Sequence, residues 1–242
     1  MDIKPLQQSI TCKNCGKIHT IDCYPIINLQ SSTAEFIQQV FNLDLFKVKC
    51  DCGTETIVQY NTVIVDMYKK YIIYMFIAEN KDIFYENIKP GLTKLFTENE
   101  QYKEVFNSLN NTRLVCSIND LLEKMLIYDY DLDDQIIECI KLSLLEDKRF
   151  IDKNISKIYF EKIDKSNLIF SALSSDENSQ PQNVGIDIEY YNITLEKYKK
   201  YTNDNKPKEF ELVDLNYIIS VLEKSNIPTE NSENNDNIDN KQ

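Results

Sequence analysis

The sequence has no tryptophan and little histidine, glycine or proline: one His, four Gly and six Pro among 242 residues. So little glycine and proline excludes a collagen-like or Pro/Gly-rich disordered chain over most of the length. Four glycines are also too few to build a phosphate-binding loop in addition to their roles in turns. Because His19 is the single histidine, any Ser-His or Cys-His catalysis would depend on it, and we expect it at the surface or beside a metal site.

Long hydrophobic runs are missing as well. The best apolar stretch, residues 71–78, has the length of a strand, well below the roughly 18 residues that a membrane span requires. Residues 1–15 contain no hydrophobic signal segment. We therefore expect a soluble, cytoplasmic protein without a membrane partner.

Positive charge is in deficit, with 27 Lys and Arg against 39 Asp and Glu, a net charge of −12. A surface of this sign repels phosphate backbones unless a basic patch is segregated from it. The densest basic stretches, residues 69–70 and 197–200, are short and lie beside tyrosines, which is typical of a solvated face. The charge thus disfavours a nucleic-acid partner, and another protein is the partner class that we expect.

Cysteine, by contrast, is concentrated near the N-terminus. Without a signal segment, the seven cysteines are expected to be reduced thiols. Two of them, Cys116 and Cys139, stand alone in apolar stretches, where cysteine acts as a small hydrophobe. The other five lie within the first 52 residues: Cys12, Cys15, Cys23, Cys50 and Cys52.

Two short motifs in this region predict a metal site. Cys12-Lys-Asn-Cys15-Gly16 is a knuckle whose two thiolates can bind one ion, and its glycine relieves the tight turn. Cys50-Asp-Cys52-Gly53 supplies a second pair, with one intervening residue where two to four are usual. Together, Cys12, Cys15, Cys50 and Cys52 can complete a tetrahedral four-sulfur shell, which favours structural Zn²⁺. If the shorter pair fails as a chelator, Cys23 or His19 is near enough in sequence to substitute.

Carboxylates offer one further constellation, at residues 131–134. The segment Asp131-Leu-Asp-Asp134 has the composition of a cluster for metal-assisted hydrolysis. It also precedes the clearest helical pattern in the chain, residues 132–145. Acidic residues there complement the positive end of the helix dipole. We therefore expect these carboxylates to stabilise the start of the helix and not to form a hydrolytic site.

Periodicity and turn signals predict an α+β fold. It consists of a zinc-ribbon-like β element with an inserted helix, a helical subdomain and a smaller C-terminal α+β region. The expected domains are residues 1–150 and 151–227, followed by a disordered acidic tail, 228–242. Specific expectations include a single strand over 20–28, a hairpin over 157–173 and a strand over 184–191.

Helix starts are predicted from capping residues and from proline. Ser32 with Glu35 has the spacing of a capping box, and Ser117 with Asp120 offers a similar start. A helical pattern begins after Pro90-Gly91, and Asp214 precedes a helix over 215–224.

The order of these features resembles the CpXC family. The resemblance rests on the Cys12–Gly16 knuckle, on a short helix followed by residues 44–50, and on the segments 60–74 and 130–138. Family members carry two C-P-x-C-G turns, whereas neither knuckle here has the proline and the second is one residue shorter. Over residues 8–145, the resemblance implies a bacterial or archaeal metal-binding domain and no particular reaction.

These observations favour a non-enzymatic interaction or scaffold module with a structural zinc. The alternative is a metal-dependent hydrolase, in which the short second pair leaves a coordination position open for water. Because a structural zinc contributes about 10–16 kcal/mol of binding energy, its removal is expected to unfold residues 8–80.

Overall fold

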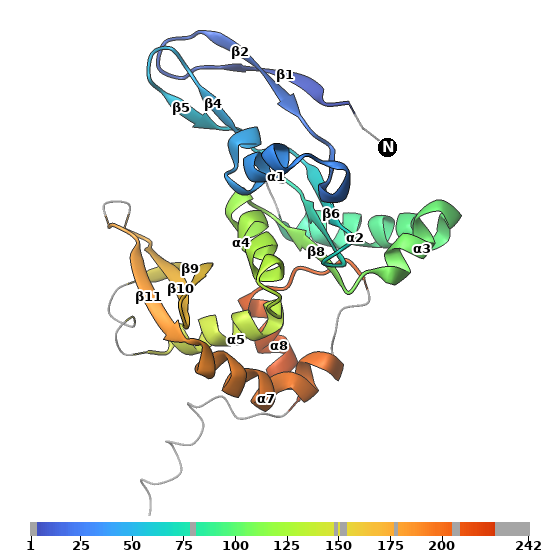
Figure 1. The fold of residues 1–242 in the computed structure, drawn as a ribbon, viewed down its shortest axis with the longest axis vertical. Coiled ribbons are helices and arrows are strands. Elements are labelled where there is room, and N and C mark those ends of the chain that lie inside the picture. Colours follow the sequence, from blue (N-terminus) through green and yellow to red (C-terminus); the bar gives the residue numbers. More distant parts are fainter. Residues whose placement is uncertain are drawn as a thin grey trace, which may run out of the picture. The chain divides into compact units, whose positions relative to one another are not determined.

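The computed structural model describes residues 4–77, 81–147, 150, 154–176, 179–204 and 209–225, and it confirms an α+β fold (Figure 1). Packing divides the chain into two compact units. The first comprises Met1–Asp131 with Pro207–Leu212, and the second comprises Leu132–Lys206 with Val213–Gln242. The domain boundaries expected at 150 and 227 stay predictions, and the tail 228–242 lies outside the described residues.

The first unit begins with two antiparallel hairpins, called here the cysteine ribbon (residues 6–23 and 47–57). Strands β1 (Leu6–Thr11) and β2 (Ile18–Cys23) form the first hairpin. The shorter strands β4 (Lys47–Lys49) and β5 (Glu55–Ile57) form the second. Each turn contains one of the two cysteine pairs, and Figure 1 shows the two turns side by side.

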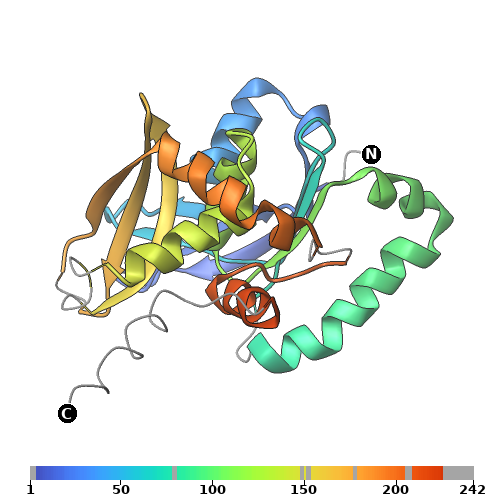
Figure 2. The same ribbon diagram turned by 90° about the horizontal axis from the view of Figure 1, so that it is seen from below.

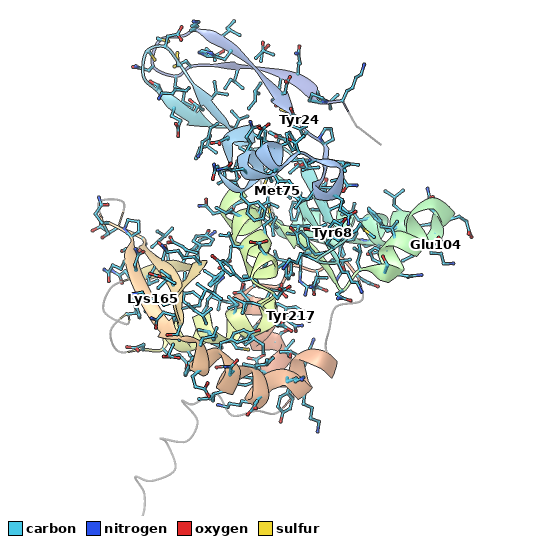
Figure 3. All side chains as sticks on the ribbon, in the orientation of Figure 1. Tyr24, Tyr68, Met75, Glu104, Lys165 and Tyr217 are labelled. Atoms are coloured by element: carbon cyan, nitrogen blue, oxygen red, sulfur yellow. The ribbon has the colours of Figure 1, made fainter. Side chains whose placement is uncertain are left out.

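The strand expected over 20–28 is two strands. After β2 the chain turns at Tyr24-Pro25 and continues as β3 (Ile26–Asn28), which joins a different sheet. Proline has no N–H to donate to a ladder, so it favours the break at this point. Tyr24 packs edge-on against Phe36, with ring centroids 5.2 Å apart, beside the base of the ribbon (Figure 3).

A four-stranded sheet forms the centre of the first unit. Its strands follow the order β3, β6 (Thr62–Asp66), β7 (Tyr71–Met75) and β8 (Asn111–Val115). The central pair, β6 and β7, is antiparallel, whereas β3–β6 and β7–β8 are parallel. Ile64, Ile73 and Met75 are completely buried.

Parallel pairs require long connections, and here they contain the ribbon's second hairpin and the helices α1, α2 and α3. Helix α1 (Ala34–Phe41) lies between β3 and β6 in sequence. Its N-cap is Thr33, whose hydroxyl accepts a hydrogen bond from the Phe36 N–H at 3.2 Å. The expected cap, Ser32, is therefore wrong by one residue, because the Ser32 hydroxyl instead donates to the Asn28 carbonyl at 2.8 Å.

The connection between β7 and β8 contains α2 (Lys81–Glu98) and α3 (Glu100–Ser108) (Figure 2). Helix α2 continues through Pro90, so the prediction that it starts after Pro90-Gly91 was wrong. Leu92 and Phe96 of its second half pack against a buried cluster that includes Phe106.

Residues 210–212 return to this unit from far along the chain. The Leu114 N–H donates to the Glu211 carbonyl at 2.9 Å, so this segment covers the outer edge of β8. The Phe210 ring lies 5.2 Å from Phe96 and 5.8 Å from Phe106, centroid to centroid. Lys89 Nζ donates to a Glu211 carboxylate oxygen at 2.6 Å.

Helix α4 (Ile118–Asp129) completes the first unit, and Ser117 caps it as predicted, accepting from the Asp120 N–H at 3.2 Å. The β6–β7 turn, which carries the exposed Tyr68 (Figure 3), contacts its other end. There Lys69 Nζ donates to the Asp129 carbonyl at 2.9 Å. A cation in this position complements the negative end of the helix dipole.

The second unit has a three-stranded antiparallel sheet and several helices, including α5 (Asp134–Leu145), α7 (Ile188–Asp204) and α8 (Leu215–Lys224). The strands lie in the order β11 (Gln182–Asp187), β10 (Asn167–Ser174) and β9 (Ile155–Asp164), which confirms the predicted hairpin (Figure 2). The strand predicted over 184–191 instead ends at Asp187, where α7 begins. Within the described residues, no helix combines the length and apolar character needed to cross a bilayer.

Candidate metal centre

The first cysteine knuckle is the turn between β1 and β2. The Cys12 N–H donates to the Lys17 carbonyl at 2.8 Å, which keeps the two strands paired beyond Thr11. Inside this pair, the Gly16 N–H donates to the Cys12 carbonyl at 2.9 Å and closes a five-residue turn. Gly16 has φ +74°, a conformation that favours glycine. The turn thus places both Cys12 and Cys15 at one end of the hairpin.

The second knuckle repeats this plan with one residue fewer. The Cys50 N–H donates to the Thr54 carbonyl and the Gly53 N–H to the Cys50 carbonyl, both at 2.9 Å. The closing bond therefore spans four residues in place of five. Gly53 again follows the second cysteine with positive φ, +87°. The missing residue shortens the turn without removing either thiol from it.

The structure brings together the four cysteines predicted from the sequence. The sulfur atoms of Cys12, Cys15, Cys50 and Cys52 all lie within 4.8 Å of one another. Two sulfur pairs join different knuckles: Cys15 to Cys50 at 3.4 Å and Cys12 to Cys52 at 3.7 Å. A tetrahedral site with Zn–S bonds of about 2.3 Å requires sulfurs about 3.8 Å apart. The cluster is therefore of the right size to hold a metal ion.

The two substitutes considered from the sequence lie outside this cluster. Cys23 is buried, its thiol donates to the Gln8 side-chain carbonyl at 3.5 Å, and burial raises its pKa. His19 is paired with Ile10 across the β1–β2 hairpin, and its Nε2 is buried with no hydrogen-bond partner in the described part of the chain. Neither belongs to the four-residue group, which is complete without them.

Exposure differs within each knuckle. Cys12 and Cys50, the first cysteine of each pair, are each only 4% exposed, whereas Cys15 and Cys52 are exposed to solvent. One side of the cluster therefore faces the hairpins and the other faces water. All seven cysteines of the chain are free thiols.

Backbone and hydroxyl groups favour negative charge on two of the sulfurs. The N–H groups of Cys15 and Asn14 lower the pKa of Cys12. The hydroxyl and N–H of Thr54 lower the pKa of Cys52 to about 5. These donors prepare the cluster for a thiolate state, the state that binds metal.

Cys50 is shifted in the opposite direction. The Cys52 N–H acts to lower its pKa, but burial and the neighbouring sulfurs outweigh that bond and raise the pKa to about 12. Four thiolates this close repel one another unless a cation lies between them. A bound dication would supply the missing positive charge and make the fully deprotonated cluster stable.

An ion pair missed by the sequence analysis joins the two knuckles. Lys17 Nζ forms a salt bridge with the Asp51 carboxylate, which raises the pKa of Lys17 and lowers that of Asp51. Both side chains are well exposed. The ion pair could have been predicted from the positions of the two residues in the sequence, because Lys17 follows the first knuckle and Asp51 lies between the two cysteines of the second. Asn14 Nδ2, from the first knuckle, lies 3.7 Å from Cys52 Sγ.

The carboxylates of residues 131–134 serve local structure, as predicted. The Asp133 side chain caps α5, accepting from the Gln135 N–H at 2.9 Å, and Asp134 lies in the first turn of that helix. Asp131 instead accepts from Lys69 Nζ at 2.9 Å. Among the described residues, the four cysteines form the one group of His, Cys, Asp or Glu side chains close enough to hold a metal.

The fold and the cluster together define a class: an α+β chain in which two knuckle hairpins gather four cysteines into a potential metal site. The family model described as CpXC protein matches residues 10–141, just over half of the 242-residue chain. The chain therefore belongs to the CpXC family, and the predicted resemblance is confirmed. No curated protein and no solved structure matches this chain.

Proposed function

We propose that this protein is a non-enzymatic interaction or scaffold module whose cysteine ribbon is held together by one structural Zn²⁺. The ligands are Cys12, Cys15, Cys50 and Cys52. The observation that carries the proposal is the convergence of four sulfurs, from two separate hairpins, to within 4.8 Å of one another. Nothing else in the fold of the ribbon requires four thiols in one place.

The ligand set supports zinc in particular. Soft thiolates in tetrahedral arrangement suit Zn²⁺, which has no geometric preference of its own and no redox chemistry. Four sulfurs also fill a four-coordinate shell and leave no position for a catalytic water. A closed shell is the reason for preferring a structural role over the hydrolase alternative. A reducing cytoplasm is the compartment that suits seven free thiols.

The ribbon has little other means of support. Within its two hairpins, Ile21 is the one large aliphatic side chain that is buried. An isolated two-stranded hairpin is marginally stable in water, whereas structural zinc contributes about 10–16 kcal/mol of binding energy. The metal would therefore supply most of the free energy that holds the two hairpins together.

The surface of the ribbon supports a protein as the partner. Three of its aliphatic side chains are more than half exposed: Leu6, Ile18 and Ile57. The ribbon's Lys and Asp/Glu residues nearly balance, although the whole chain carries −12. Near-neutral surface with scattered apolar side chains suits contact with another protein better than contact with a polyanion.

Metal content and the cobalt spectrum of the purified chain test the proposal. One zinc per chain, with an intense four-thiolate d–d spectrum after cobalt substitution, is the expected result. A spectrum with fewer sulfurs and an open position would favour the hydrolase. Absence of bound metal from protein purified under reducing conditions would refute the zinc site.

Serine variants test the structural role. Cys12→Ser and Cys15→Ser should each lose zinc and the protease resistance of the ribbon. Cys23→Ser, which alters a buried thiol outside the cluster, should keep both and is the matched control. A Cys15→Ser protein that stays folded without metal would overturn the structural role.

A further inference from the structure

The cluster presents its four sulfurs unequally to reagents in solution. Cys15 and Cys52 are exposed, and Cys12 and Cys50 are buried. A small oxidant therefore meets one exposed sulfur from each knuckle first. Oxidation of cysteine follows both accessibility and thiolate character, and zinc coordination supplies the thiolate character to all four.

The two exposed sulfurs differ in their hydrogen bonds. The Thr54 hydroxyl lies 3.3 Å from Cys52 Sγ and can donate to it as a thiolate, and Asn14 Nδ2 lies 3.7 Å from the same sulfur. Such donors withdraw electron density and make a thiolate a weaker nucleophile. Among the described residues, neither of these side chains donates to Cys15. Cys15 is therefore the more reactive of the two exposed thiolates.

One sulfur of the other knuckle lies close to Cys15. Cys50 Sγ lies 3.4 Å away, closer than the 3.7 Å between Cys12 and Cys52. A disulfide requires a sulfur separation of about 2.05 Å, so this pair has the shorter distance to close. Cys50 is also buried, so that it reacts with an oxidised Cys15 more readily than with the oxidant itself.

We propose that the cluster is a two-electron oxidation site for hydroperoxides, in which Cys15 is oxidised, Cys50 closes a cross-knuckle disulfide and zinc is released. The inference rests on the proposed zinc site for the thiolate state of Cys15 and for the release step. The product retains a covalent link between the two hairpins in place of the metal. The two hairpins of the ribbon would thus stay linked to each other after the ion is lost.

The reaction balances with hydrogen peroxide as the oxidant. The Cys15 thiolate attacks one peroxide oxygen, so that an S–O bond forms, the O–O bond breaks and hydroxide leaves, taking up a proton to become water. The Cys50 thiolate then attacks the Cys15 sulfur, so that the S–S bond forms, the S–O bond of the sulfenic acid breaks and hydroxide leaves, taking up a proton from solvent to become a second water. The sulfur pair loses two electrons and the peroxide gains them. A Zn²⁺ ion held by the four sulfurs would lose two of its ligands and be released.

The test treats the full-length, zinc-loaded chain with hydrogen peroxide and follows zinc with a chromogenic chelator. Trypsin, without reduction, places Cys12 and Cys15 on different peptides, because Lys13 lies between them. The expected result is one zinc released per chain, together with a cross-link between the Cys15 peptide and the one that contains Cys50 and Cys52. Tandem mass spectrometry should assign that link to Cys50.

Two variants sharpen the test. Cys23→Ser should behave as the parent chain. Thr54→Val removes the hydroxyl beside Cys52 and should shift part of the product to a Cys12–Cys52 disulfide. A dominant Cys12–Cys15 or Cys12–Cys52 disulfide in the parent chain, or sulfinic acids without a disulfide, would overturn the assignment. If the chain binds no zinc, the proposed function and this inference both fail. If it binds zinc but peroxide yields a different product, this inference alone fails.

Discussion

Removal of zinc should unfold the cysteine ribbon and leave the four-stranded sheet folded. The reason is the uneven distribution of buried apolar side chains within the first unit. The ribbon buries Ile21 and three of its cysteines (Cys12, Cys23 and Cys50), whereas the sheet completely buries Ile64, Ile73 and Met75. The sheet therefore has a core of its own, and the loss of structure should end near residue 57, short of the residue 80 expected from the sequence.

The size of the effect depends on free zinc. Binding energies of about 10–16 kcal/mol correspond to dissociation constants of about 10⁻⁷ to 10⁻¹² M. With free zinc held about 100-fold above that constant, the metal stabilises the folded ribbon by about 2.7 kcal/mol, and at 1,000-fold by about 4.1 kcal/mol. Amide protection in the ribbon should accordingly fall about 100-fold on chelation and should scale with free zinc.

Hydrogen exchange followed by mass spectrometry measures this directly. Peptides from residues 6–23 and 47–57 should exchange faster after chelation, while peptides from residues 62–75 and 111–115 should not change. The Cys23→Ser variant should give the same result as the parent chain. Unchanged ribbon exchange after verified loss of the metal would refute the reasoning, as would equal acceleration of the sheet.

Three further predictions concern the first unit. Phe46 is completely buried and stacks on Tyr60 with ring centroids 4.8 Å apart. The Phe46→Ala substitution should therefore lower the free energy of unfolding by about 3–5 kcal/mol, measured by urea unfolding followed by tyrosine fluorescence. A loss below about 1 kcal/mol would contradict this packing. Burial raises the pKa of Tyr71 above its ordinary value of 10.0, so the folded state holds a proton that the unfolded chain releases, and stability should fall as the pH rises above about 10. The Tyr71→Phe variant should lose up to about 1.4 kcal/mol less unfolding free energy per pH unit over this range than the parent chain. An identical pH dependence of the unfolding free energy in the two proteins would argue against this reasoning. Ser117→Ala removes the cap of α4 and should cost about 1 kcal/mol, seen as faster amide exchange in that helix and in none of the strands.

The cysteine cluster was predictable because its chemistry is encoded in short motifs. A cysteine pair followed by glycine specifies a knuckle, whatever surrounds it. The motif alone does not predict whether the thiols of the shortened pair, Cys50 and Cys52, come close enough to those of the first pair to share one ion. That outcome depends on where the β4–β5 hairpin closes, which is set by the Cys50–Thr54 hydrogen bond and by packing of the two hairpins.

Helix starts were predictable where a capping side chain makes a hydrogen bond to a backbone N–H only a few residues away. The caps at Ser117 and Asp214 are local hydrogen bonds, and their helices start where the sequence predicted. The start of α2 was missed because a proline usually ends or opens a helix, and the helix continues through Pro90 regardless. The parallel pairing of β7 with β8 joins segments separated by two helices, and no local signal encodes it.

The return of residues 210–212 to the edge of β8 has a consequence for the order of folding during synthesis. Phe210 fills a place among Phe96 and Phe106 that the earlier residues leave open. Ribosomes add about 5–20 residues per second, so about 4–16 s pass between the emergence of residue 131 and that of residue 212. Throughout that interval, the nascent first unit has an unpaired strand edge and an incomplete aromatic cluster. The ribbon needs no residue beyond 57, so the four sulfurs of a newly made chain can come together well before the cluster around Phe210 is complete.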